Sequence, residues 1–300
     1  MRRSAYPALR PGALIGVVAI SGPVRRAKLQ RGAKLLRERG YRVRFGRHVL
    51  ERRGYLAGSD RARAADLNRM LRNPEVDAVL FARGGYGALR VLDHVDWAAL
   101  RRGPKLLAGF SDLTALFAAA RREAGVPTLH GPTASTLCEP RRYHATSFWA
   151  GLEGRFERMT LSFPPSCVMR GGVARGELAG GCLSLLVSLV GTRYQPDLRG
   201  RILFWEEVNE EPFRIDRLLQ QVRLSGMLRG VRGVIVGRWV NCRARGPSLS
   251  EKELLRDCLL PLGVPVVRSV RVGHCLRAHS VPLGVPARLD TRRGTLSFGA

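Results

Sequence analysis

The chain has 300 residues, enough for one large domain or two compact ones, and its 45% hydrophobic and 25% charged residues are typical of a folded globular protein. Its formal charge of +27 is compatible with a phosphate-rich partner. However, only four of the 51 basic residues are lysines, the arginines are spread along the whole chain, and no helix-turn-helix, zinc-finger or aromatic-platform motif accompanies them, which argues against nucleic-acid binding as the main function.

The first apolar run, from Ala13 to Ile20, is short and rich in β-branched residues, and it ends in Ser21-Gly22-Pro23. This pattern indicates a buried strand that enters a turn, and not a signal peptide. No segment reaches the roughly 18 consecutive apolar residues that a membrane span needs. The six cysteines, at 138, 167, 182, 242, 258 and 275, form no Cys-x-x-Cys pair, which predicts buried free thiols. We therefore expect a cytoplasmic protein without membrane contact.

The rest of the first half alternates apolar strand patterns with helical ones. We expect strands at 14–20, 41–45, 78–82 and 106–110, with helices at 28–39 and 62–71. Strands that alternate with helices indicate an α/β domain, in which helices cover the faces of a parallel sheet.

The rhythm is lost from 139 to about 170, where Phe163-Pro164-Pro165-Ser166 is typical of a connector. Further on, we expect strands at 202–205 and 233–236, a helix at 215–224, and Gly/Pro-rich segments to the end. We therefore divide the chain into an N-terminal α/β domain at 1–145, a linker at 146–170, and a smaller mixed α/β domain at 171–300.

A serine stands where an apolar strand meets an amphipathic helix, in Gly109-Phe110-Ser111-Asp112-Leu113. At such a junction the hydroxyl projects from the carboxyl end of the sheet, and the N–H groups of the helix start favour an oxyanion. Taken alone, the motif is more typical of a helix N-cap. It is also not the Gly-x-Ser-x-Gly elbow of the α/β-hydrolases.

A glycine-rich turn, Arg83-Gly84-Gly85-Tyr86-Gly87, follows the expected strand at 78–82. Glycines allow backbone N–H groups to approach a ligand closely, as in phosphate loops and oxyanion holes. The spacing matches neither a dinucleotide fingerprint nor a P-loop, and a purely structural turn is the alternative.

Two more strand ends carry polar side chains. Four glutamates crowd positions 206 to 211 of this basic chain, and His274 follows a glycine near an expected strand end. An exposed acidic loop and an ordinary loop histidine are the alternatives. Metal binding by His274 and His279 is disfavoured because no acidic third ligand follows at short spacing. Together, Ser111, Glu206 and His274 supply the three parts of a serine triad, whose sequence order is free.

The chain also resembles a known family, the LD-carboxypeptidases of peptidoglycan recycling, which includes the microcin C immunity proteins. The resemblance covers nearly the whole chain and rests on six ordered blocks: Ala82-Arg83-Gly84-Gly85-Tyr86-Gly87, Gly109-Phe110-Ser111-Asp112-Leu113, His130-Gly131-Pro132, Gly180-Gly181-Cys182-Leu183, Phe204-Trp205-Glu206-Glu207 and Gly273-His274.

The resemblance implies Ser111 as nucleophile, His274 as general base and acid, and Glu206 as the carboxylate that fixes the imidazole. It implies an oxyanion hole from the N–H groups of Gly85 and Asp112. It also implies a flavodoxin-like or Rossmann-like N-terminal sheet with helices on both faces, a smaller C-terminal domain, an active site between them, a homodimer, and no metal or cofactor.

The implied substrate is a murein tetrapeptide or related L,D-peptide, which loses its terminal D-alanine. Arg83, Gly84 and Tyr86 are candidate substrate contacts, because a guanidinium matches the geometry of a carboxylate. Two positions depart from the family: Cys182 replaces the usual Asn, and Glu207 replaces an Asp. Three alternatives stay open: the same triad acting on a microcin C-type peptidyl-nucleotide, a non-catalytic binding protein, and a basic nucleic-acid-binding module.

Overall fold

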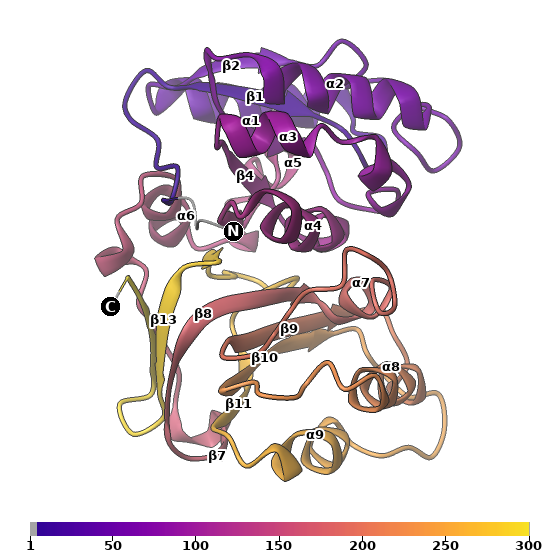
Figure 1. Cartoon of the computed structure of the whole chain (residues 1–300), viewed down its shortest axis with the longest axis vertical. Helices are drawn as coiled ribbons and strands as arrows, with labels where there is room; N and C mark the ends of the chain where they lie inside the picture. The colour runs from indigo at the N-terminus through magenta and orange to yellow at the C-terminus, as the bar shows by residue number, and fades with distance from the viewer. Residues whose placement is uncertain (1–4, 300) are drawn as a thin grey trace.

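The structure is a computed structural model that describes residues 5–299, and its strands form two sheets that occupy the two halves of the molecule (Figure 1). The first sheet has six strands in the order β12-β5-β4-β3-β1-β2. Their bounds are β1 (Leu14–Val18), β2 (Arg42–Phe45), β3 (Val76–Phe81), β4 (Leu106–Gly109), β5 (Thr128–His130) and β12 (Val281–Leu283).

Strands β1 to β5 are parallel, and their order β2-β1-β3-β4-β5 is that of flavodoxin-like sheets. Right-handed crossovers place α1 (Arg26–Glu38) on the opposite face from α2 (Asp60–Arg72), α3 (Trp97–Arg102) and α4 (Thr114–Ala124). In agreement, α1 packs on the short α5 (Ala134–Leu137), while α3 packs on both α2 and α4. The expected parallel sheet with helices on both faces is confirmed.

The second sheet has eight strands in the order β6-β14-β13-β8-β9-β10-β11-β7. Within it, β8, β9, β10 and β11 run parallel to one another. The bounds of all eight strands are β6 (Leu161–Ser162), β7 (Val168–Arg170), β8 (Val173–Cys182), β9 (Ile202–Val208), β10 (Gly233–Val240), β11 (Val266–Val270), β13 (Pro286–Asp290) and β14 (Thr295–Phe298). Helices α7 (Leu183–Val187), α8 (Pro212–Leu224) and α9 (Glu251–Leu259) pack beside this sheet (Figure 1).

The second half of the chain contains more regular structure than the sequence pattern predicted. The expected linker at 146–170 contains most of α6 (Ala145–Leu152) and the strands β6 and β7, which pair with β14 and β11. The Gly/Pro-rich segments at the end of the chain contain α9 and four strands that the pattern did not single out. Strand β12 returns to the first sheet and pairs antiparallel with β5. The division at 145 and 171 therefore stays a prediction.

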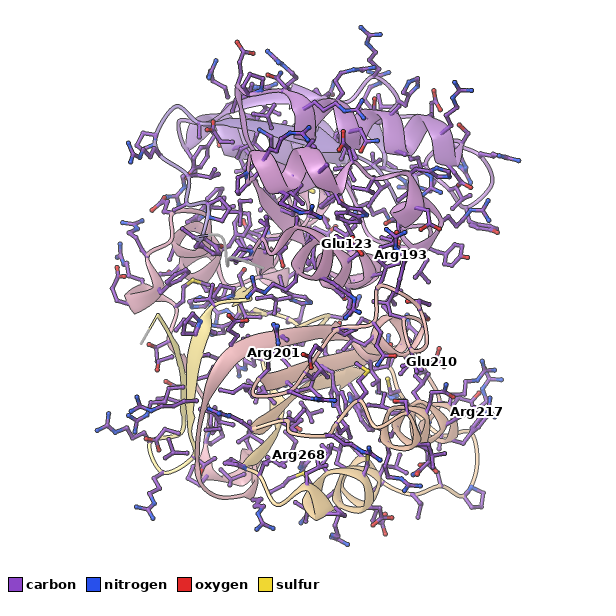
Figure 2. All side chains as sticks on the ribbon, viewed as in Figure 1. Glu123, Arg193, Arg201, Glu210, Arg217 and Arg268 are labelled. Carbon is purple, nitrogen blue, oxygen red and sulfur yellow. The ribbon has the colours of Figure 1, made fainter. Side chains whose placement is uncertain are left out.

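Charged contacts join the two halves between α4 and β8. Arg121 of α4 donates to both carboxylate oxygens of Glu177 on β8, at 2.9 and 2.7 Å, and Arg201 lies 3.0 Å from the same carboxylate. Glu177 is only 8% exposed. Figure 2 shows a second such pair, Glu123 and Arg193, at the same boundary, and their side chains approach to 3.8 Å.

Basic side chains project from both halves of the molecule (Figure 2), as the even spread of arginine along the sequence predicted. Many of them are paired with carboxylates, for example Arg44 with Glu75 and Arg90 with Asp60. Within residues 5–299, no helix combines the length and apolar character needed to cross a bilayer.

We predict that Glu177→Gln lowers the free energy of unfolding by about 3 kcal/mol, because it removes the negative charge that the partly buried Arg121 guanidinium contacts. Urea denaturation measures this change. The matched control is Glu75→Gln, which breaks the exposed pair with Arg44 and should cost less than about 1 kcal/mol. Equal effects of the two substitutions would refute a role for Glu177 in holding the halves together.

Candidate active site

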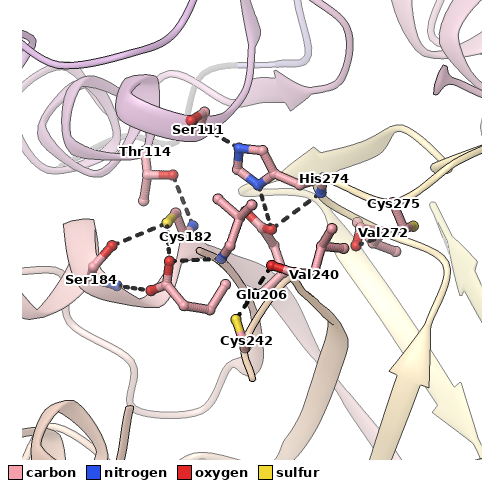
Figure 3. Close-up of polar contacts among 12 residues, drawn as sticks. Ser111, Thr114, Cys182, Ser184, Glu206, Val240, Cys242, Val272, His274 and Cys275 are labelled. Carbon is pink, nitrogen blue, oxygen red and sulfur yellow. Dashed lines mark hydrogen bonds and ion pairs between the residues drawn. The ribbon is translucent and has the colours of Figure 1, made fainter. Parts of the chain in front are cut away.

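A hydrogen-bond chain joins Ser111, His274 and Glu206 where the two halves meet (Figure 3). The Ser111 Oγ lies 3.0 Å from His274 Nε2, and His274 Nδ1 lies 2.7 Å from Glu206 Oε2. The backbone N–H of His274 donates to the same Oε2 at 3.2 Å. Because a carboxylate on Nδ1 leaves Nε2 free to accept a proton, this arrangement can activate the serine hydroxyl for attack on a carbonyl carbon.

Ser111 stands two residues after the end of β4, in the 3₁₀ turn Ser111–Leu113 that leads into α4. Its φ of 68° lies in the left-handed region, which a residue with a side chain rarely adopts. Gly84 faces it closely, because a Cβ on Gly84 would lie 3.0 Å from Ser111 Cβ. The strained turn therefore presents the hydroxyl beneath the glycine-rich loop. The N-cap alternative is wrong for Ser111 and Asp112, since no side-chain cap bond is present at either helix start.

The glycine-rich loop is held by buried charged side chains. Asp112 Oδ2 accepts the N–H of Ala88 at 2.8 Å, which connects the loop to the start of α4. Arg63 of α2 is fully buried and donates to the carbonyls of Gly87 and Ile20. These contacts hold the loop that carries Gly85, whose φ is +115°. The N–H groups of Gly85 and Asp112 as an oxyanion hole stay a prediction.

Glu206 and Glu207 lie near the end of strand β9, just before its last residue, Val208, and are 0% and 1% exposed, so the alternative of an exposed acidic loop is wrong for both. A glycine is required beside Glu206. Gly273 has a φ of +94°, and a Cβ there would lie 2.3 Å from Glu206 Cγ. Gly273 thus allows the His274 backbone to approach the carboxylate.

His130, at the end of β5, is a buried histidine beside this chain of contacts. It is 2% exposed, and its Nε2 has no hydrogen-bond partner among residues 5–299. Its ring lies edge-on to Phe204 at 5.1 Å, and the ring of Phe110 contacts both His130 and His274, at 6.1 and 5.0 Å. Burial lowers the pKa of His130 to about 4, although the Glu206 charge opposes this shift. A neutral His130 leaves the negative charge of Glu206 available to His274.

Cys182 and Glu207, the two departures from the family pattern, contact each other. The Cys182 thiol donates to Glu207 Oε1 at 3.4 Å, while Glu207 Oε2 accepts the N–H of Ser184 at 2.8 Å. Burial raises the pKa of Cys182 well above its ordinary value, so the thiol stays protonated and remains a donor. The backbone N–H of Cys182 donates to Thr114 Oγ1 at 2.9 Å, which ties β8 to the start of α4.

A cleft of about 530 Å³ opens beside Ser111 and His274, over the carboxyl ends of β1, β3, β4 and β5. Arg83 and Gly84, two of the candidate substrate contacts, line it, whereas Tyr86 is not among its lining residues in the described part of the chain. Tyr86 instead lies edge-on to Tyr55 at 5.6 Å. Its role as a substrate contact stays a prediction.

Other lining residues were missed by the sequence analysis: Arg25, Lys28, Thr133, Ser135, Thr136, Glu139 and Arg142. The expected sheet topology could have indicated these residues. Ligands of doubly wound sheets bind at the carboxyl ends of the strands, near the position where the strand order reverses, which here lies between β1 and β3. Residues that follow β1 and β5 were candidates on that ground.

All six cysteines are free, and four are buried, whereas Cys138 and Cys242 are partly exposed. Within residues 5–299, no group of three or more His, Cys, Asp or Glu side chains has the arrangement of a metal site.

Comparisons with known proteins point to one family. The model of the LD-carboxypeptidase N-terminal domain matches residues 15–131, and that of the LD-carboxypeptidase C-terminal domain matches residues 175–289. A Streptomyces coelicolor protein provisionally named a carboxypeptidase is 44% identical over 99% of this chain and 97% of its own. A Bacillus subtilis protein provisionally named a murein peptide carboxypeptidase is 37% identical over 96% of this chain and 92% of its own.

Solved structures share the fold. A muramoyltetrapeptide carboxypeptidase from Oxalobacter formigenes has a TM-score of 0.81 and 28% identity, covering 96% of this chain and 99% of that one. The wild-type microcin C7 self-immunity protein has a TM-score of 0.84 and 22% identity, covering 98% of both chains. The second likeness concerns the fold alone.

We predict that a fluorophosphonate, which reacts with activated serine hydroxyls, labels Ser111. Ser111→Ala and His274→Gln should abolish labelling, and Glu206→Gln should slow it by roughly 10³- to 10⁴-fold, because the imidazole loses its partner. Mass spectrometry locates the label. The exposed Ser248→Ala serves as the control, and unchanged labelling of His274→Gln would contradict the contact seen here.

His130 predicts a pH dependence of stability. The pKa of His130 is about 4 in the folded chain, whereas the ordinary value is 6.5. As the pH falls from 6.5 towards 4, this histidine therefore binds a proton in the unfolded chain but not in the folded chain. Stability contributed by neutral His130 is thus present above pH 6.5 and lost below it, by about 2 kcal/mol at pH 5.

Urea denaturation at pH 7 and pH 5 tests this. His130→Phe should show a smaller loss of stability between the two pH values than the wild type, while replacement of the exposed His94 by Phe should not change the loss. Equal losses in the wild type and His130→Phe would show that His130 is not held neutral.

Proposed function

The chain belongs to the LD-carboxypeptidase family, and we propose that it is a serine carboxypeptidase that releases terminal D-alanine from murein tetrapeptides. The observation that carries this proposal is the continuous contact from Ser111 Oγ through the His274 ring to the buried Glu206. A relative in Pseudomonas aeruginosa that is named murein tetrapeptide carboxypeptidase, 28% identical over 93% of this chain, supports the choice of substrate.

In the proposed reaction, His274 Nε2 takes the proton of Ser111 while Oγ attacks the carbonyl carbon of the L-centre. Glu206 Oε2 holds the Nδ1–H and stabilises the imidazolium that forms. The N–H groups of Gly85 and Asp112 stabilise the oxyanion, a contribution of about 3 to 4 kcal/mol per donor. The C–N bond then breaks, and His274 returns the proton to the departing amine of D-alanine. Water hydrolyses the acyl-enzyme by the same route.

The positive charge of the cleft supports cleavage at the C-terminal end of a peptide substrate. A carboxypeptidase must bind the terminal carboxylate of its substrate, and Arg25, Arg83 and Arg142 line the cleft. Arg83 adjoins the glycine-rich loop over Ser111 and donates to the carbonyl of Pro23 at 2.9 Å. We assign the terminal carboxylate to Arg83, because its guanidinium is exposed and matches a carboxylate in shape. The homodimer and the cytoplasmic location stay predictions.

The test is release of free D-alanine from L-Ala-D-Glu-meso-diaminopimelate-D-Ala. We expect release by the wild type and by Ser248→Ala, and a loss of at least about 10⁴-fold in Ser111→Ala, because the nucleophile is removed. A chiral amino-acid assay measures the product. No release by the wild type would overturn the murein assignment, and hydrolysis of a peptidyl-nucleotide instead would favour the self-immunity alternative. Salt-dependent DNA binding that survives Ser111→Ala would favour the nucleic-acid alternative.

A further inference from the structure

The cleft contains an ion pair that the proposed reaction does not use. Lys28 Nζ lies 2.5 Å from Glu139 Oε1, and Arg142 Nε lies 3.8 Å from Glu139 Oε2. All three side chains line the same cleft as Ser111 and His274. Glu139 is its only carboxylate among the described lining residues, against the cations Arg25, Lys28, Arg83 and Arg142.

The ion pair of Lys28 and Glu139 contributes little to the stability of the fold. The side chains of Lys28 and Glu139 are 40% and 36% exposed, and ion pairs so open to water contribute little to stability. Lys28 belongs to α1 and Glu139 follows α5, and these helices are already held by close backbone packing. A Cβ on Gly32 of α1 would lie only 1.9 Å from the carbonyl oxygen of Ala134 in α5. The contact of the two helices thus does not require the ion pair.

We infer that Lys28, Glu139 and Arg142 form a subsite for a substrate side chain that ends in both an ammonium and a carboxylate. This inference rests on the proposed function and adds to it a determinant of substrate choice. The ligand carboxylate binds Lys28 and Arg142, and the ligand ammonium binds Glu139, so each charge of the ion pair receives a new partner of opposite sign.

The pair of opposite charges explains why both ligand groups are needed. An ammonium alone competes with Lys28 for Glu139 and leaves Lys28 without a partner. A carboxylate alone competes with Glu139 for Lys28 and leaves the carboxylate of Glu139 with Arg142 only. Only a group that carries both charges compensates both side chains, so the subsite selects against ligands that lack either one.

Three tetrapeptides that differ at the residue before the terminal D-alanine test the inference. meso-Diaminopimelate supplies both groups, L-lysine supplies only the ammonium, and L-2-aminopimelate supplies only the carboxylate. For D-alanine release, we expect kcat/KM for the diaminopimelate peptide to exceed both others by about tenfold. Lys28→Gln should remove the preference over the lysine peptide, and Glu139→Gln should remove the preference over the aminopimelate peptide.

The matched controls are Lys34→Gln and Glu38→Gln, which make the same changes in an exposed ion pair of α1 that does not line the cleft. Both should keep the preferences of the wild type. Equal kcat/KM for the three peptides, or preferences that survive in Lys28→Gln and Glu139→Gln, would overturn the subsite while leaving the proposed function in place.

A binding experiment tests the subsite separately if the proposed reaction is wrong. If the wild type releases D-alanine from none of the peptides, their binding to Ser111→Ala is measured by titration calorimetry. A tighter Kd for the diaminopimelate peptide, lost in Lys28→Gln and Glu139→Gln, would support the subsite independently of the reaction. Equal Kd values would overturn it.

Discussion

The hydrogen bond from Ser111 to His274 crosses the boundary between the two sheets, and the rest of the structure must keep it in place. Ser111 follows a strand of the first sheet, whereas Glu206 lies near the end of a strand of the second and His274 lies beyond the last parallel strand of that sheet. A shift of about 1 Å between the halves would break the contact. The two halves therefore have to behave as one body around the site.

Several features of the boundary meet this requirement. The N–H of Cys182 bonds to Thr114 Oγ1 three residues after Ser111, and a Cβ on the neighbouring Gly181 would lie 2.4 Å from that oxygen. The buried carboxylate of Glu177 binds Arg121 at the far end of the same helix. Strand β12 extends the first sheet with residues from the end of the chain. Helix α4 is thus fixed to the second sheet along its length.

Burial sets the charges around the site. Glu206 is removed from water and bonded to His274 through one oxygen, while its Oε1 has no hydrogen-bond partner among residues 5–299. His130 stays neutral nearby because burial lowers its pKa to about 4. The cleft on the other side of Ser111 is open and cationic. A buried carboxylate that is bonded to the imidazole through one oxygen thus lies behind His274, and groups suited to an anionic peptide lie in front of it.

The sequence by itself determined four of the five parallel strands of the first sheet, β1 to β4, because buried strands and amphipathic helices leave local patterns that need no knowledge of distant residues. It also singled out Ser111, Glu206 and His274, since each follows or ends an apolar strand, and the resemblance assigned their roles. The sequence analysis did not predict strands β13 and β14, or the pairing of β12 with the first sheet. Their apolar patterns are short, and β12 and β13 pair with strands far away in the chain. Only the tertiary structure decided that Ser111 and His274, 163 residues apart, approach to 3.0 Å, and that Lys28 and Glu139 share their cleft. The reason is physical: such contacts depend on how two packed sheets are placed relative to each other, which no local pattern records.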